Sequence, residues 1–102
     1  MQDAVDEWMD QWKAGYWPPL VNLARLIEEV GELSRELNHK HGPKQKKESE
    51  DERRGDPVAD ELADILFAVT AIANAEGIDL EEAFGTMMNK VWKRDADRWE
   101  RK

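Results

Sequence analysis

The sequence predicts an all-α fold in a single domain, a bundle of four helices. Apolar residues recur at intervals of three and four rather than two, which is the spacing of one helix face. Runs of β-branched residues, which are typical of strands, are absent. A chain of 102 residues suffices for one small domain, which buries only about 60 to 65% of its unfolded surface. Its stability margin is therefore thin.

The first two predicted helices flank a proline corner. The first covers about 3–13, and Gly15 ends it before the corner at 17–19. The second covers 19–37 and starts with Pro19, where a missing N–H costs nothing. Its apolar stripe consists of Leu20, Leu23, Ile27, Val30, Leu33 and Leu37.

A charged segment separates the second helix from the third. Residues 39–56 contain almost no apolar side chain and mix lysine with glutamate and aspartate, so we expect a flexible, solvated loop. Asp56 then caps a third helix, which has Pro57 at its first position and is closed by Gly77.

A capping box predicts the start of a fourth helix. Asp79 and Glu82 form its two ends, and the charged tail 93–102 can continue the helix. The apolar residues of this helix are Phe84, Met87, Met88, Val91 and Trp92. The whole chain, 1–102, is thus expected to be one domain.

Charge and composition exclude several classes of protein. The chain has 23 acidic and 15 basic residues and a net charge of −8, which disfavours a nucleic-acid binder. It has no cysteine, so disulfides, thiolate zinc sites and a cysteine nucleophile are excluded. Neither a signal peptide nor an apolar run of about 18 residues is recognisable, so we expect a cytoplasmic protein without membrane contact.

Carboxylates occupy unusual positions on the second and third predicted helices. At about 100° per residue, Glu61 lies within the apolar stripe of its helix, and Asp64 lies one turn further along. On the second helix, Glu29 is flanked by apolar residues in the same way, with Glu28 and Glu32 close to it. Both helices therefore direct carboxylates at or beside the surface through which they pack.

Such a cluster needs a compensating positive charge. Two carboxylates about 4 Å apart repel by roughly 4 kcal/mol at an effective dielectric constant near 20. Oxygen ligands without histidine or cysteine select Mg²⁺ or Mn²⁺. The alternatives are that these glutamates are solvated, or that Arg25 and Arg35 neutralise them.

The acidic pattern resembles that of a known family. Residues 28–32 (EEVGE) and 61–64 (ELAD) resemble the EExxE and ExxD pair of MazG-like nucleoside triphosphate pyrophosphohydrolases. The likeness extends to 15–17 with 19–20, 24–33, 38–39, 64–67, 73–74 with 77–78, and 94–95 with 97–99. It covers nearly the whole chain and indicates the short bacterial single-domain branch of the family.

This resemblance implies a reaction and a set of residues. Glu29, Glu32, Glu61 and Asp64 would hold Mg²⁺, with Mn²⁺ as a substitute, and the ions would bind the triphosphate. Water activated by the metal would attack the α-phosphorus, and pyrophosphate would leave. Glu28 would act as general base or hold a further ion, although Glu32 could also be the base.

Substrate contacts are expected from three further pairs of residues. Lys90 and Arg94 would bind phosphate oxygens, unless they form only a solvated helix end. Tryptophans near the first helix could stack on the base, although core or dimer contacts are the usual role of such a stripe. Two asparagines could bind base or sugar, although capping or packing is the more ordinary role. These four residues are Trp12, Trp17, Asn38 and Asn74.

The resemblance also implies a homodimer or a dimer of dimers, in which a second subunit adds apolar contact area. The expected function is the hydrolysis of (deoxy)nucleoside triphosphates, in the house-cleaning of nucleotide pools. Two alternatives remain at this point. One is a narrow dUTP or dCTP hydrolase, and the other is a helical dimerisation or regulatory module without catalytic activity.

Overall fold

The computed structural model describes residues 1–43 and 55–102, and these form four α-helices. In chain order they are α1 (Gln2–Asp10), α2 (Pro19–His41), α3 (Pro57–Ala75) and α4 (Leu80–Arg94). The described part contains no strand, so the predicted all-α class is confirmed.

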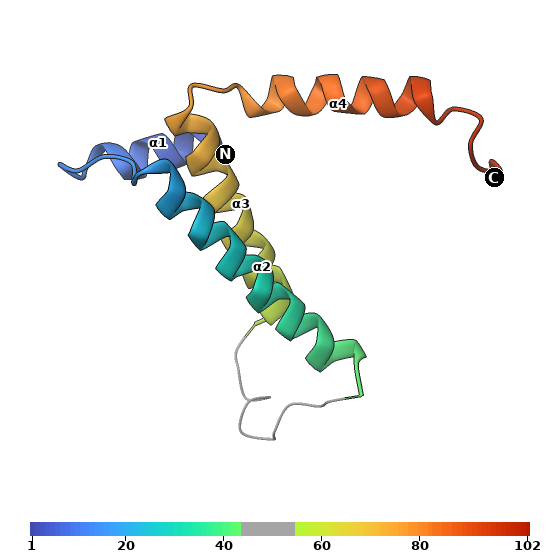
Figure 1. The fold of residues 1–102 in the computed structure, drawn as a ribbon, viewed down its shortest axis with the longest axis horizontal. Helices are drawn as coiled ribbons and strands as arrows, with labels where there is room; N and C mark the ends of the chain where they lie inside the picture. Colours follow the sequence, from blue (N-terminus) through green and yellow to red (C-terminus); the bar gives the residue numbers. More distant parts are fainter. Residues whose placement is uncertain (44–54) are drawn as a thin grey trace.

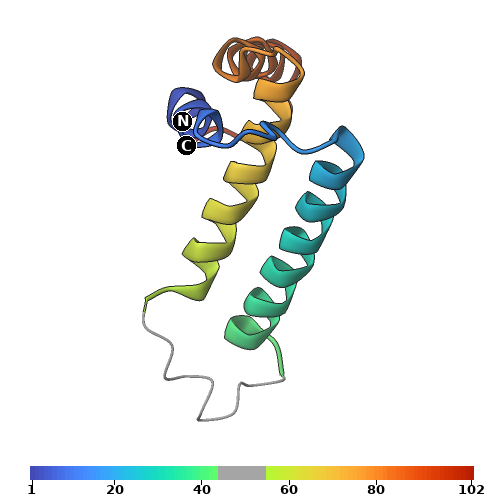
Figure 2. The same ribbon diagram turned by 90° about the vertical axis from the view of Figure 1, so that its left-hand side faces the viewer.

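Three of the helices pack together and the fourth extends away from them. α2 and α3 run antiparallel side by side, and α1 lies across the C-terminal half of α3 (Figures 1 and 2). α4 projects outward from the end of α3 (Figure 1). The radius of gyration is 17.6 Å, whereas a compact domain of this length has about 13 Å. A single chain is therefore an open assembly of helices rather than a closed bundle.

The core is small and lies where α1 meets α3. Val5 and Met9 of α1 pack against Ala71, and Tyr16 and Phe67 cover the edge of this cluster. The other buried side chains of α3 are also small: Ala68, Thr70 and Ala73. Small side chains let helix backbones approach closely, so α1 can pack against α3 although it contributes few apolar side chains to the core.

The predicted caps position the helices that carry the acidic residues. The Asp56 carboxylate accepts hydrogen bonds from the backbone N–H groups of Val58 and Ala59, at 3.0 and 3.4 Å. The Asp79 carboxylate accepts one from Glu82 N–H at 3.0 Å. Gly77 has φ +69° and closes α3, as expected for a residue that must adopt the left-handed region.

The structure corrects several predicted boundaries. α1 ends at Asp10 rather than near residue 13, because turns follow it in place of helical hydrogen bonding. In these turns the N–H of Trp12 donates to the Met9 carbonyl, and the N–H of Gly15 donates to the Trp12 carbonyl. α2 continues to His41, so 39–41 are helical and do not belong to the predicted loop 39–56. Most of that loop lies outside the described residues. α4 ends at Arg94, and a turn closed by Arg98 N–H on the carbonyl of Asp95 replaces the expected continuation.

Large apolar side chains remain exposed on α2 and α4. On α4, Phe84 is 59% exposed and Trp92 is 68% exposed, and no residue of this helix is buried. On α2, Leu20 and Ile27 are 78% and 63% exposed. The apolar faces of α2 and α4 therefore lack a covering element within the described residues.

In the part of the chain that the structure describes, no helix is both long and apolar enough to span a bilayer.

Candidate metal centre

Three of the predicted acidic residues converge where α2 packs against α3. Glu29 and Glu32 come from α2 and Glu61 comes from the first turns of α3. One carboxylate oxygen from each lies within 4.8 Å of the other two. Glu29 and Glu61 are partly buried, and Glu32 is exposed at the rim. The structure thus brings together residues that are far apart in the sequence, as the helix phases predict.

The electrostatics of this cluster centre on Glu61. Burial, together with the adjoining carboxyl groups of Glu29 and Glu32, raises the pKa of its carboxyl group from 4.5 to about 7. The Oε2 atoms of Glu29 and Glu61 are buried, and no hydrogen-bond donor of the described residues reaches them. Buried acceptors without partners destabilise a fold, so the cluster has capacity for a cation.

The donor set fits a hard divalent cation. It offers carboxylate oxygens alone, without sulfur or imidazole, which is the ligand type that Mg²⁺ and Mn²⁺ take in proteins. Because Glu32 is exposed, water or phosphate oxygens could reach an ion at this cluster as further ligands. Among the described residues, this is the group of acidic side chains that could hold such an ion.

An arginine adjoins the acidic cluster. Nε of Arg25 lies 4.0 Å from Oε1 of Glu29, one helical turn away on α2. Its guanidinium carbon lies 4.9 Å from the ring centroid of Trp17 and 5.5 Å from that of Phe67. Arg35, the other candidate to neutralise the cluster, forms no ion pair with a described residue. Neutralisation by arginine is thus confined to one side of Glu29.

The two remaining predicted acidic residues lie at the surface. Glu28 on α2 and Asp64 on α3 are both exposed, and neither belongs to the group of converging oxygen atoms. Their assignment as catalytic base and metal ligand stays a prediction. Glu28 directly precedes Glu29 on α2, and Asp64 lies one turn after Glu61 on α3.

The predicted phosphate-binding residues lie on α4, away from the cluster of the same chain. Lys90 and Arg94 are exposed on this projecting helix (Figure 1). Nη2 of Arg94 is 3.1 Å from a carboxylate oxygen of Asp95, and this pairing lowers the pKa of Asp95. A contact between α4 and the acidic cluster therefore requires another copy of the chain or a rearrangement of α4.

The two predicted stacking tryptophans differ in their surroundings. Trp17 is 41% exposed and its ring carries the guanidinium of Arg25, which places it on the side of α2 that leads to Glu29. Trp12 is 52% exposed and packs edge-on against Trp8, with 5.5 Å between ring centroids. Trp17 is thus the tryptophan of the two that is linked through a contact to the acidic cluster.

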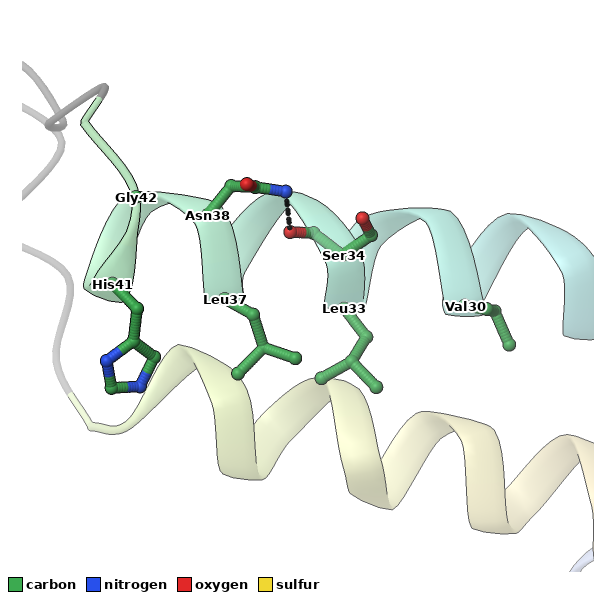
Figure 3. Close-up of a pocket in the computed structure, with 7 residues that line it drawn as sticks. All are labelled: Val30, Leu33, Ser34, Leu37, Asn38, His41 and Gly42. Carbon is green, nitrogen blue, oxygen red and sulfur yellow. Dashed lines mark hydrogen bonds between the residues drawn. The ribbon is translucent and has the colours of Figure 1, made fainter.

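Asn38 lies near the C-terminal end of α2, where it lines an apolar pocket of about 560 Å³ (Figure 3). Its side-chain amide donates a hydrogen bond to the carbonyl of Ser34, at 2.9 Å. Leu33 and Leu37 point toward α3, whereas Asn38 lies on the opposite side of α2 (Figure 3). None of the described residues that line the pocket is acidic, and none belongs to the acidic cluster.

Asn74 belongs to a polar network that sequence reasoning did not find. Its amide nitrogen donates to the Tyr16 hydroxyl and to the Gln2 carbonyl, at 2.9 and 3.0 Å. Nε2 of Gln2 donates to the Asn74 side chain and to the carbonyl of Ile78. Its Oε1 accepts from Leu80 N–H, at the start of α4. The network fastens α1 to the junction of α3 and α4.

The distance between Asn74 and the cluster follows from helix geometry. Asn74 and Glu61 lie on the same helix, and a rise of 1.5 Å per residue separates them by about 20 Å. No local pattern in the sequence could show the network, because Gln2 and Asn74 are 72 residues apart. The predicted substrate contact of Asn74 stays a prediction, since its hydrogen bonds here are structural.

The fold and the cluster define a class of protein, an all-α protein with a carboxylate centre between two antiparallel helices. The family model of the MazG nucleotide pyrophosphohydrolase domain matches residues 18–99, which include the whole of α2, α3 and α4. The chain belongs to this family and is a hydrolase. A module without catalytic activity, the alternative raised by the sequence, is thereby set aside.

Similar proteins of known sequence come from Bacillus subtilis (strain 168). YpjD is 46% identical over 102 residues, which cover 100% of this chain and 89% of the relative. YvdC is 26% identical over 98 residues, which cover 88% of this chain and 92% of that protein.

Two crystal structures share the fold. The Bacillus-conserved MazG protein, a nucleotide pyrophosphohydrolase, is 44% identical with a TM-score of 0.73, over 88% of this chain and 83% of that one. The structure of YpjD is 43% identical with a TM-score of 0.77, over 87% of this chain and 88% of that one.

Proposed function

We propose that this protein is a Mg²⁺-dependent pyrophosphohydrolase that cuts (deoxy)nucleoside triphosphates to the monophosphate and pyrophosphate. The observation that carries this proposal is the convergence of Glu29, Glu32 and Glu61, with two buried carboxylate oxygens that lack partners. Family membership supports the reaction type, and the crystallised Bacillus-conserved MazG relative is a nucleotide pyrophosphohydrolase.

The proposed metal ligands are Glu29, Glu32, Glu61 and Asp64. Oxygen atoms of the first three lie within 4.8 Å of one another, which supports this assignment, and Asp64 is one turn further along α3 from Glu61. A bound Mg²⁺ would supply Lewis-acid chemistry, by lowering the pKa of water, offsetting phosphate charge and orienting the leaving group. The displacement then needs no protein nucleophile, which suits a chain without cysteine.

The chain's own residues would manage the proton and the substrate. In the hydrolysis, a water oxygen bonds to the α-phosphorus while the bond to the β-phosphate bridging oxygen breaks. Glu28 or the exposed Glu32 would accept the proton that this water loses. Trp17, which contacts Arg25 beside the cluster, is the proposed stacking surface for the base.

We also propose that the active form is a homodimer or a dimer of dimers. The open shape of one chain and the exposed apolar faces of α2 and α4 support this assembly. A second copy would cover those faces and could bring Lys90 and Arg94 of α4 to the phosphates of the neighbouring site. Apolar area covered in this way would stabilise a chain whose own core is small.

Product identification tests the reaction. Purified protein is incubated with a panel of normal and modified (d)NTPs in Mg²⁺, and the products are separated by ion-exchange chromatography, with EDTA as the control. We expect pyrophosphate and monophosphate, and no turnover in EDTA. Orthophosphate with diphosphate would contradict the proposed cleavage. Turnover confined to dUTP or dCTP would favour the narrower alternative.

A further inference from the structure

Arg25 adjoins the acidic cluster but has no role in the reaction proposed above. It lies between the acidic cluster and two aromatic rings, with Nε at 4.0 Å from Glu29 and its guanidinium over Trp17 and Phe67. Its side chain is 35% exposed, so one side of the group is open to solvent. It is thus a partly exposed cation at the edge of a site proposed to receive a triphosphate.

The ion pair with Glu29 leaves most of this guanidinium unused. The contact is long, made by one nitrogen, and joins residues on the same helix, and such pairs contribute little to stability. An arginine has five N–H donors, and no oxygen of a described residue accepts a hydrogen bond from Arg25. The donor capacity of Arg25 is therefore available to a ligand.

The aromatic rings fix the guanidinium in a defined place. Ring centroids at 4.9 and 5.5 Å are within the range of cation–π contact, and a planar guanidinium stacks well on such surfaces. These contacts engage the charge of the group, and no oxygen of a described residue accepts a hydrogen bond from its N–H donors. Two parallel N–H donors in one plane match the oxygens of a phosphate group.

The electrostatics favour an exchange of partners. A divalent cation held by Glu29, Glu32 and Glu61 would repel the guanidinium from Glu29 and would bring phosphate oxygens close to it. Lys90 and Arg94 of the same chain lie on α4, which projects away from this region (Figure 1). Within one chain, Arg25 is the basic residue of the described part that contacts the acidic cluster.

We propose that Arg25 is a phosphate-binding residue of this site, which leaves Glu29 and donates to a phosphate of the metal-bound triphosphate. This inference rests on the proposed function, because it requires the acidic cluster to bind the metal and substrate. It differs from a purely structural role, in which Arg25 would only hold Glu29 in place.

The two roles predict opposite effects on Mg²⁺ binding. If Arg25 binds phosphate, Arg25→Gln removes a positive charge beside the cluster, so Mg²⁺ alone should bind as tightly as before or severalfold more tightly. If Arg25 only positions Glu29, the same change should weaken Mg²⁺ binding.

Calorimetric titrations of the full-length chain test this inference. Wild type, Arg25→Gln, Arg25→Lys and the control Arg35→Gln are titrated first with Mg²⁺ and then with inorganic pyrophosphate in saturating Mg²⁺. For Arg25→Gln we expect pyrophosphate affinity to fall about tenfold to a hundredfold. Arg25→Lys should recover part of this loss, because it retains the charge without the fork. Arg35→Gln should match wild type.

Three results would count against the inference or its basis. Unchanged pyrophosphate affinity in Arg25→Gln would overturn the phosphate contact. A loss of Mg²⁺ affinity, with pyrophosphate binding lost in parallel, would assign Arg25 to positioning alone. Failure of the wild type to bind Mg²⁺ and pyrophosphate would instead overturn the proposed function itself. Circular dichroism of each variant checks that its helices are intact, and Arg25→Lys provides the test if Arg25→Gln does not fold.

Discussion

Glu61 is the residue of the cluster whose ionisation is most clearly disfavoured by burial and by the neighbouring carboxyl groups. Its carboxyl group lies between helices, against those of Glu29 and Glu32, and its pKa is raised to about 7 by burial and by these neighbours. Near neutral pH, a proton on Glu61 partly relieves the repulsion. A divalent cation at the same place would displace that proton, so metal binding and protonation compete.

Stability in the absence of metal should therefore depend on pH through Glu61. A folded-state pKa near 7, above the ordinary 4.5, contributes stability that is complete below pH 4.5 and is lost as pH rises through 7. We predict that, in EDTA, Glu61→Gln melts above wild type by a margin that grows from pH 5 to pH 8, to about 5 °C. Thermal denaturation at several pH values measures it, and a constant margin would contradict the shift.

The proposed ligands should be essential for turnover but not for the fold. We predict that Glu32→Gln and Glu61→Gln each lower kcat/KM by at least about a hundredfold, because each removes a charged oxygen ligand. Far-UV circular dichroism should be unchanged. Glu7→Gln, an exposed change on α1, is the control and should retain full activity. Full activity in either cluster variant would refute the assignment.

At the residue scale, helix phase was informative and distant pairing was not. The inward positions of Glu29 and Glu61 follow from counting residues along a helix, and the structure brings both together. The contact of Arg25 with Trp17 could not be counted in this way, because Trp17 precedes α2 in a non-helical segment. Such a contact depends on the path of the chain through the proline corner.

At the scale of elements, the network around Gln2 and Asn74 sets the direction of α4. Gln2 binds the short connection between α3 and α4 at the Ile78 carbonyl, and the first residue of α4 at the Leu80 N–H. Asn74 completes the network through Tyr16. The N-terminal residues thereby hold the junction from which α4 projects.

Truncation of Asn74 should destabilise the fold. Asn74→Ala removes the hydrogen bonds that Asn74 donates to the Tyr16 hydroxyl and the Gln2 carbonyl and the one that it accepts from Gln2, so we predict a loss of about 1 to 3 kcal/mol in the free energy of unfolding. Urea denaturation measures this loss, with Asn89→Ala on exposed α4 as the control. A substrate contact would in addition raise KM, and an unchanged KM would leave Asn74 a structural role only.

The ends of elements were partly predictable from their capping residues. Asp56, Asp79 and Gly77 mark real ends, because their chemistry acts over two or three residues. The end of α2 could not be read from its apolar stripe, since polar residues up to His41 continue the backbone hydrogen bonding beyond Leu37. Polarity alone does not stop a helix when no glycine or proline intervenes.

At the scale of the whole molecule, the exposed face of α4 is the feature that a single chain does not explain. Phe84, Met87 and Trp92 are 59%, 43% and 68% exposed and lie on one side of the helix. We predict that light scattering after size exclusion gives a mass of at least twice 11.8 kDa. A monomer at micromolar concentration would contradict the proposed assembly.

A charge on that face should weaken the assembly. We predict that Trp92→Glu shifts the protein toward the monomer in the same measurement, because burying a carboxylate in an apolar interface is unfavourable. Thr86→Glu is the matched control, since at about 100° per residue it lies on the opposite side of α4 from Phe84. Equal masses for the two variants would place the contact elsewhere.

The four helices could be expected from periodicity, but their arrangement could not. Whether four amphipathic helices close into one bundle depends on the connections, and the short turn after Gly77 directs α4 outward instead (Figure 1). An apolar stripe predicts that one face of a helix is covered, but it does not show whether the same chain or a second copy covers it.

The most direct test of the central claim is an anomalous diffraction measurement on crystals grown with Mn²⁺. We predict a peak between α2 and α3, within coordinating distance of carboxylate oxygens of Glu29, Glu32 and Glu61. Manganese bound elsewhere, with these three side chains directed into solvent, would contradict it.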